Sequence, residues 1–235
     1  MRSVADALIA AAFAPTCLAC ARVLDGPTRS PVCATCWARI QVFPEGGADV
    51  VLSCASLSRV RAVGPFEDVL RDVVHGLKFQ GRRTLAARLG PLLRAAAGDV
   101  LTGADAVVPV PLHPWRQWQR GYNQADLLAS GLGHAVWRVL RRRRATTAQT
   151  SLDRDARRRN VAGAFALGGW WPVPASGARQ RIASRTLVLV DDVLTTGATL
   201  DACARVLLDA GAREVRAITV ARAEPGRTPA NLPNR

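Results

Sequence analysis

Two adjacent carboxylates and a run of threonines have the types and spacing needed to bind a sugar phosphate. The segment LVLVDDVLTTGATL, residues 187–200, places Asp191 and Asp192 after an apolar run. Such carboxylates accept hydrogen bonds from neighbouring sugar hydroxyls. A small-residue turn then opens a helix, whose free N–H groups attract phosphate. The turn consists of Thr195, Thr196, Gly197, Ala198 and Thr199. The segment has neither the lysine of a Walker loop nor a GxGxxG pattern.

Four cysteines form a second group that could do chemistry. Cys17 and Cys20 make one CxxC pair, and Cys33 and Cys36 make another. Two such pairs supply four thiolates to one tetrahedral ion, which predicts a structural zinc site with no open position for water. Disulfides, a redox-active CxxC and plain thiols are the alternatives, and a reducing cytosol disfavours disulfides. The isolated Cys54 and Cys203 are expected to be small buried side chains.

The chain is strongly basic, with a formal net charge of +14 and a single lysine, Lys78, among 32 basic side chains. Such a charge favours polyanions or phosphorylated small molecules, although a solvated basic face is an alternative. Tryptophans and a tyrosine lie close to arginines in one stretch, as in proteins that stack single-stranded bases beside a basic groove. These residues are Trp115, Arg116, Trp118, Arg120 and Tyr122, with Trp137 nearby. Trp115 and Trp118 are expected in an exposed polar loop, whereas Trp137 could equally be a core residue.

Alternating strands and helices position these groups. The pattern predicts strands over 59–63, 105–110, 186–190 and 215–221, and helices over 67–79, 84–97, 124–140 and 197–210. Residues 141–160 are highly charged without a clean period, which indicates a mobile loop. The alternation predicts a doubly wound α/β fold with a mainly parallel sheet, whose ligands bind at the carboxyl ends of the strands. We expect an N-terminal helix and zinc module over 1–47, an α/β domain over 48–223 and a disordered tail over 224–235.

The segment 187–200 resembles the phosphoribosyl pyrophosphate (PRPP) motif of type I phosphoribosyltransferases over about a dozen positions. VVPVPLHPWRQWQRGYNQADLLA, residues 107–129, is similar to the signature of the ComF/GntX family. HGLKFQG, residues 75–81, and the double CxxC also fit that family, as does a spaced pattern in 146–165. The resemblance covers about 17–222. It implies a zinc-bearing N-terminus, a type I phosphoribosyltransferase core and an association with natural competence or, in some members, gluconate uptake.

The resemblance also implies roles for individual residues. Asp191 and Asp192 would bind the ribose hydroxyls, and residues 195–199 the 5′-phosphate. The turn of Pro111, Leu112 and His113 would occupy the pyrophosphate-loop position, although His113 could equally be an ordinary loop histidine. Residues 141–160 would stand where related enzymes carry a flexible lid, with Arg144, Gln149, Arg157 and Asn160 as its candidate residues. Arginines there can neutralise pyrophosphate.

Three functions remain open from the sequence. The first is a PRPP- and Mg²⁺-binding protein of DNA uptake that also holds single-stranded DNA, with a competence helicase or a recombination-loading protein as possible partners. The second is an active transferase, in which Mg²⁺ and arginines stabilise departing pyrophosphate while a base nitrogen or amine attacks a cation-like ribose. Its acceptor-binding segment is not evident. The third is a PRPP-sensing regulator.

The sequence also bears on location. Residues 1–15 carry one basic residue, Arg2, and Asp6 interrupts their apolar stretch, which fits a short helix better than an export segment. No other stretch has the length and apolar character of a membrane span. We therefore expect a cytoplasmic protein without a membrane span.

Overall fold

The computed structural model describes residues 15–24, 30–44, 55–144, 161, 163–168 and 175–223. Its centre is a four-stranded sheet in the order β1-β6-β5-β2, with every neighbouring pair parallel. The strands are β1 (Val60–Pro65), β2 (Ala106–Pro109), β5 (Thr186–Leu194) and β6 (Glu214–Arg222). A separate antiparallel pair joins β3 (Leu140–Arg142) to β4 (Phe165–Leu167). The expected mainly parallel sheet is confirmed.

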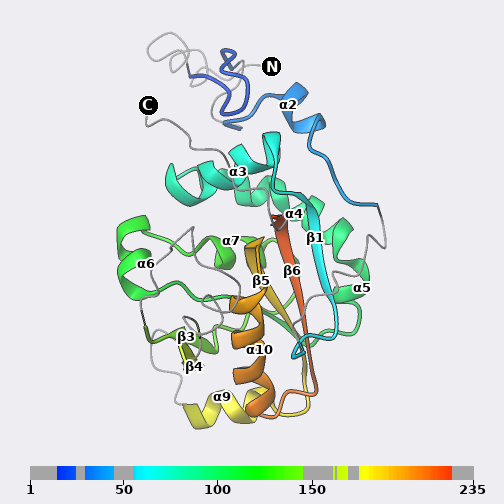
Figure 1. Cartoon of the computed structure of the whole chain (residues 1–235), viewed down its shortest axis with the longest axis vertical. Helices are drawn as coiled ribbons and strands as arrows, with labels where there is room; N and C mark the ends of the chain where they lie inside the picture. The colour runs from blue at the N-terminus through cyan, green and yellow to red at the C-terminus, as the bar shows by residue number, and fades with distance from the viewer. Residues whose placement is uncertain are drawn as a thin grey trace.

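Helices cover both faces of this sheet, and β5 shows why. Val188 and Val190 point into a core shared with α3 (Asp68–Phe79), α4 (Thr84–Ala96) and α7 (Gln124–Ser130). Leu187 and Leu189 point into the opposite core, against α9 (Ala175–Ile182) and α10 (Ala198–Asp209). This alternation with a period of two places apolar side chains on both faces. Figure 1 shows α10 lying along β5.

The remaining described helices are short: α2 (Ala34–Ala38), α5 (Gly98–Leu101) and α6 (Pro114–Arg120). The described residues around the four cysteines, 15–24 and 30–38, form what we call the cysteine segment. It lies at one end of the molecule, beyond α3 (Figure 1). Cys17 and Cys36 belong to the same buried cluster as the apolar face of α3. A Cβ added at Gly76 of α3 would come within 2.7 Å of Leu18 Cδ1, so a larger residue would have to displace this leucine side chain. The segment therefore shares its core with the α/β domain.

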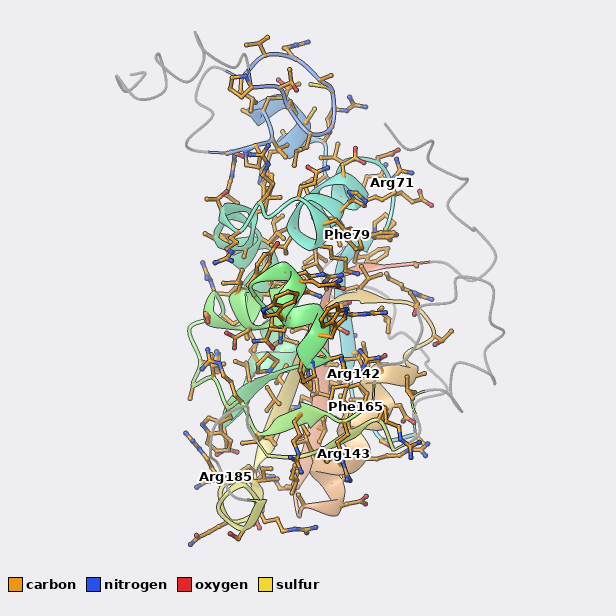
Figure 2. The ribbon with its side chains drawn as sticks, turned by 90° about the vertical axis from the view of Figure 1, so that its left-hand side faces the viewer. Arg71, Phe79, Arg142, Arg143, Phe165 and Arg185 are labelled. Atoms are coloured by element: carbon orange, nitrogen blue, oxygen red, sulfur yellow. The ribbon has the colours of Figure 1, made fainter. Side chains whose placement is uncertain are left out.

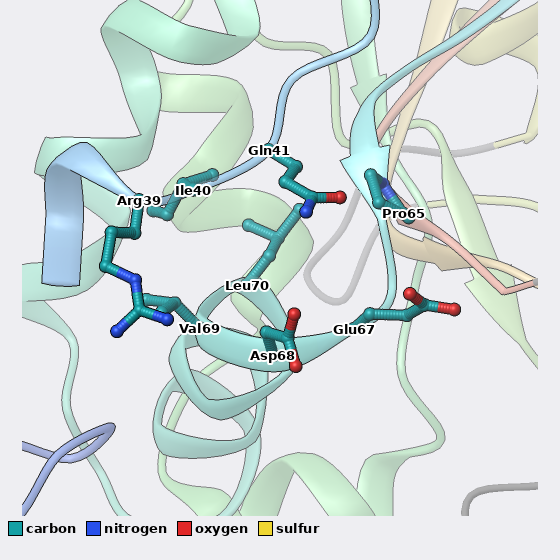
Figure 3. Close-up of a pocket in the computed structure, with 8 residues that line it drawn as sticks. All are labelled: Arg39, Ile40, Gln41, Pro65, Glu67, Asp68, Val69 and Leu70. Atoms are coloured by element: carbon teal, nitrogen blue, oxygen red, sulfur yellow. The ribbon is translucent and has the colours of Figure 1, made fainter.

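Residues 39–44 lead from α2 to the sheet. Phe43 donates its backbone N–H to the carbonyl of Val63 at 2.8 Å, which fixes this segment beside β1. The close approach continues at Gly64, where a Cβ would lie 2.0 Å from the carbonyl oxygen of Gln41. A small pocket occurs at this junction, between Gln41, Pro65 and the first turn of α3 (Figure 3). The expected domain boundary at 47 lies outside the described residues.

Two predicted elements were wrong in extent. The helix expected over 124–140 ends at Ser130, because Gly131 and Gly133 follow and Gly133 adopts a φ of 75°. The chain then runs alongside β2, where the backbone N–H of Trp137 donates to the carbonyl of Val107 at 2.9 Å. Arg141 and Arg142, expected in a mobile loop, lie in β3. The expected helix in 1–15, most of the loop over 141–160 and the tail from 224 lie outside the described residues.

The other predicted helices and strands occur within a few residues of their expected bounds. The strand expected over 186–190 continues to Leu194, because its pairing with β6 extends to Arg222. Asp191 and Asp192 therefore lie within the strand and not after it. Cys203 is buried as expected, whereas Cys54 lies outside the described residues. Among the described residues, no helix has the length and apolar character required to cross a bilayer.

Candidate phosphoribosyl site

The turn between β5 and α10 forms the first part of the site. Gly197 precedes the helix with a φ of 77°, a left-handed conformation that strains other residues. The Thr196 hydroxyl accepts the N–H of Ala198 at 3.5 Å, while Thr195 is exposed. The first N–H groups of α10 therefore face the carboxyl edge of the sheet, where a helix N-terminus favours a phosphate.

The acidic pair forms the second part. Because successive side chains of a strand alternate, Asp191 and Asp192 lie toward opposite faces of the sheet. Asp191 shares the side of Cys203 and Arg142, whereas Asp192 contacts α3 and α7. Burial and the neighbouring Asp192 carboxylate raise the pKa of Asp191 to about 7, although Lys78 and Arg142 oppose the shift. Asp191 is therefore only partly ionised near neutral pH.

Asp192 is 3% exposed, and both of its carboxylate oxygens are occupied. Lys78 Nζ lies 2.7 Å from Oδ1, and Gln124 Nε2 donates to Oδ2 at 2.7 Å. Gln124 is itself held by Arg120, whose Nη1 donates to Oε1 at 3.1 Å. Side chains of α3 and α7 thus contact this carboxylate of β5, and α6 supports the contact through Gln124.

Further cations surround the pair. Arg142 on β3 lies with its guanidinium 5.3 Å from the centre of the Phe165 ring, and Figure 2 shows the two side chains together. Burial lowers the pKa of Arg142, as does the nearby Arg116, while Asp191 raises it. Arg120 shows the same pattern, with Asp192 as the carboxylate that opposes its burial. Lys78, Arg120 and Arg142 thus act on the two carboxylates, with Arg116 close to both arginines, which leaves an excess of positive charge suited to an anion.

The predicted pyrophosphate-loop residues follow β2, the neighbour of β5. Val110 donates its backbone N–H to Val190 at 3.0 Å, so Pro111, Leu112 and His113 leave the sheet at the same edge as the acidic pair. His113 caps α6, because its Nδ1 accepts the N–H of Trp115 at 3.3 Å. The histidine thus has a structural partner, as the loop-histidine alternative expects. Of the lid residues, Arg144 is exposed, whereas Gln149, Arg157 and Asn160 lie outside the described residues.

The aromatic residues proposed for nucleic acid divide into two groups. Trp115 and Trp118 are 59% and 73% exposed and stack on each other, with ring centroids 5.2 Å apart. Their exposure agrees with the prediction, although they lie on α6 and not in a loop. The prediction for Tyr122 was wrong: its ring is buried, and its hydroxyl donates to the carbonyl of Leu77. Trp137 is half-buried against the second core, below the guanidinium of Arg181.

Sequence reasoning missed several residues of this region. Lys78, Gln124 and Arg142 contact or influence the acidic pair, yet they come from segments far from it in the sequence. Phe79 was also missed as an exposed aromatic residue: it is 63% exposed, and the Arg120 guanidinium lies 4.9 Å from its ring centre. The one available signal was the presence of a single lysine in an arginine-rich chain.

The four cysteines of the double CxxC come together as predicted. Their sulfur atoms lie within 4.8 Å of one another, and those of Cys20 and Cys33 are 3.9 Å apart. Tetrahedral zinc with Zn–S bonds of about 2.3 Å separates its sulfurs by about 3.8 Å, whereas a disulfide requires about 2.05 Å. Burial raises the pKa of Cys36 to about 12, whereas backbone N–H groups outweigh burial at Cys17 and lower its pKa to about 6. The four thiols could hold a zinc ion.

The fold and the edge of β5 define a phosphoribosyltransferase-like protein. The family model described as a phosphoribosyl transferase domain matches residues 126–231. Competence protein F of Haemophilus influenzae is 30% identical over 205 residues, which cover 82% of this chain and 85% of that protein. The chain therefore belongs to the ComF family of competence proteins. The DNA utilization protein YhgH of Escherichia coli K12 is 36% identical over 67% of this chain and 69% of its own length.

Solved structures give a weaker likeness. TT1426 from Thermus thermophilus matches 65% of this chain and 86% of its own, at 19% identity and a TM-score of 0.31. A hypoxanthine phosphoribosyltransferase from Staphylococcus aureus matches 68% of this chain and 77% of its own, at 13% identity and a TM-score of 0.30.

Proposed function

We propose that the chain binds PRPP with Mg²⁺ at the carboxyl edge of β5 and single-stranded DNA on the surface of α6, in the service of DNA uptake. The observation that carries the PRPP site is the pairing of Asp191 and Asp192 with a glycine turn at the N-terminus of α10, surrounded by cations. The names of the relatives, competence protein F and DNA utilization protein, support the role in DNA uptake.

Each part of the ligand has a matching group. Residues 195–199 would hold the 5′-phosphate, the acidic pair the ribose hydroxyls, and residues 111–113 the diphosphate. Asp191 is the carboxylate with oxygen available to Mg²⁺, a hard ion that prefers oxygen ligands and would neutralise diphosphate charge. In this proposal Arg144, Gln149, Arg157 and Asn160 belong to a lid over the diphosphate.

The DNA surface would consist of the exposed aromatic side chains and their arginines. Trp115 and Trp118 present ring faces on α6, while Arg116 and Arg120 of the same helix supply positive charge. Phe79, beside Arg120, extends the surface toward the acidic pair. Stacking on aromatic rings together with charge holds single strands without sequence preference. A competence helicase or a recombination-loading protein would deliver or receive the strand. We keep the proposed domain bounds, with the zinc module over 1–47 and the α/β domain over 48–223.

Phosphoribosyl transfer is the second candidate function, and the raised pKa of Asp191 favours it. A carboxyl group with a pKa of about 7 can accept a proton from an attacking nitrogen at neutral pH. The other side chains of the site would then orient the ribose and neutralise the departing diphosphate. Pyrophosphate released from PRPP in the presence of an acceptor, and lost in Asp191→Asn, would establish transfer.

Calorimetric titration with Mg·PRPP tests the main proposal, first alone and then with a short single-stranded DNA present. We expect micromolar binding that is lost in the Asp191→Asn/Asp192→Asn variant while the domain stays folded. Unchanged affinity in the double variant would contradict the site. Absence of PRPP binding to the unaltered protein would leave a zinc-containing, basic DNA-binding protein.

A further inference from the structure

The one lysine of the chain lies in the candidate site. Lys78 is in the last turn of α3, and its Nζ is 2.7 Å from Asp192 Oδ1. All other basic side chains among the 32 are arginines. We propose that Lys78 is a ligand-binding residue, which exchanges its contact with Asp192 for a contact with the diphosphate of a phosphoribosyl ligand. This inference rests on the proposed function.

The contacts of Asp192 show which partner must move. Asp192 is 3% exposed beneath its two partners, Lys78 on Oδ1 and Gln124 on Oδ2, so a ribose hydroxyl reaches this carboxylate only if one of them moves aside. Gln124 is buried and held by Arg120, so it stays in place. The Lys78 side chain is 22% exposed and ends in a single ammonium group on a four-carbon stem. Lys78 is therefore the partner that can withdraw.

Charge then determines where the ammonium goes. A diphosphate entering at this edge brings several negative charges beside a lysine that has lost its carboxylate partner. An ammonium can rotate its three donors onto a new oxygen, whereas a guanidinium keeps a fixed fork of donors. Arg120 stays committed to Gln124 and to the Phe79 ring. Lys78 is thus the cation of the site best able to exchange one anion for another.

The test compares two ligands that differ in the diphosphate. Dissociation constants for Mg·PRPP and for ribose 5-phosphate are measured with the unaltered full chain, Lys78→Met and Lys78→Arg. We expect Lys78→Met to weaken Mg·PRPP by between about 10-fold and 100-fold, the range for one charged hydrogen bond, and to leave ribose 5-phosphate within about 3-fold. Lys78→Arg keeps the charge and should recover part of the loss. Arg185→Gln removes a paired cation at the opposite end of β5 and should change neither constant.

Each other outcome overturns the proposal. Equal weakening of both ligands in Lys78→Met would mean that the lysine only holds Asp192 in place, and unchanged constants would mean that it does not bind the ligand. If the unaltered protein binds ribose 5-phosphate but not Mg·PRPP, the proposed function is wrong, and the role of Lys78 that rests on it is refuted with it. If Lys78→Met does not fold, Lys78→Met/Asp192→Asn is compared with Asp192→Asn, since this pair lacks the unpaired buried carboxylate. The same selective loss of Mg·PRPP is expected there, and no further loss would refute the proposal.

Discussion

Asp191 and Asp192 are neighbours in the chain but lie toward opposite faces of the sheet. Asp192 is paired with Lys78 and Gln124 on the side of α3 and α7, whereas Asp191 lies on the side of Arg142 and Cys203. Asp191 Oδ1 also accepts the backbone N–H of Asp192 at 2.8 Å. The two carboxylates thus differ in environment, and we expect substitutions of each to have different effects.

Asp191→Asn should stabilise the fold at high pH only. The pKa of Asp191 is raised from 3.8 to about 7, first by burial and then by Asp192. The folded state therefore binds the proton more tightly than the unfolded state does. The stabilisation that this proton gives the fold is lost as the pH rises from about 4 to 7. Asparagine resembles the protonated form, so the variant should gain about 1–3 kcal/mol in free energy of unfolding at pH 8 and nothing at pH 4. Urea unfolding at both values measures this, and a pH-independent difference would contradict it.

Asp192→Ala should instead destabilise the fold. Removing this carboxylate leaves Lys78 and Gln124 without their partner, and breaking a buried, hydrogen-bonded pair costs about 3 kcal/mol. Because Lys78 is partly exposed and can reach water, we expect about 2 kcal/mol. Asp126→Ala is the matched control, since its pairing with Arg138 is more exposed and should contribute less than about 1 kcal/mol. Equal losses in the two variants, measured by denaturant unfolding, would contradict the assigned burial of Asp192.

Gly197→Ala should weaken ligand binding and the fold together. At a φ of 77°, a Cβ costs about 1–2 kcal/mol of stability. The strain would also displace the N–H groups that open α10, so Mg·PRPP affinity should fall about tenfold. Gly98→Ala is the control, because Gly98 is helical and a Cβ there meets no atom within 4 Å. Titration and thermal unfolding of both variants give the comparison, and unchanged affinity in Gly197→Ala would argue against a phosphate at this turn.

The site residues that lie close together in the sequence could be predicted from it. The residues that reach the site from distant parts of the chain could not. Residues 187–200 form a strand, a turn and a helix from their own pattern, so the acidic pair and Gly197 could be placed in advance. Lys78 and Gln124 lie 114 and 68 positions away from Asp192, and only the packing of α3 and α7 on the sheet brings them together. Tyr122 was misplaced for the same reason, since its partner Leu77 belongs to α3.

The α6 aromatic pair should carry much of the affinity for single-stranded DNA. Base stacking on an exposed ring contributes about 1–3 kcal/mol, so Trp115→Ala/Trp118→Ala should weaken binding of a short oligonucleotide at least tenfold. Mg·PRPP affinity should stay unchanged. Tyr122→Phe is the control: it keeps the buried ring and removes one hydrogen bond, so it should lose about 1 kcal/mol of stability and no DNA affinity. Fluorescence anisotropy at fixed salt measures the DNA affinity of each variant. Full DNA affinity in the double variant would mean that DNA does not bind on α6.

Zinc removal should loosen the cysteine segment and, through it, the packing on α3. Cys17 and Cys36 share a buried cluster with Val73 and Leu77, so losing the ion should lower the melting temperature by about 2–4 °C for each kcal/mol lost. We expect one zinc per chain by elemental analysis, loss of that zinc in Cys20→Ser and its retention in Cys203→Ala, since Cys203 is buried far along the chain in α10. A purified protein with no zinc and no titratable thiols at the four positions would instead support disulfides, and chelators would then leave the melting temperature unchanged.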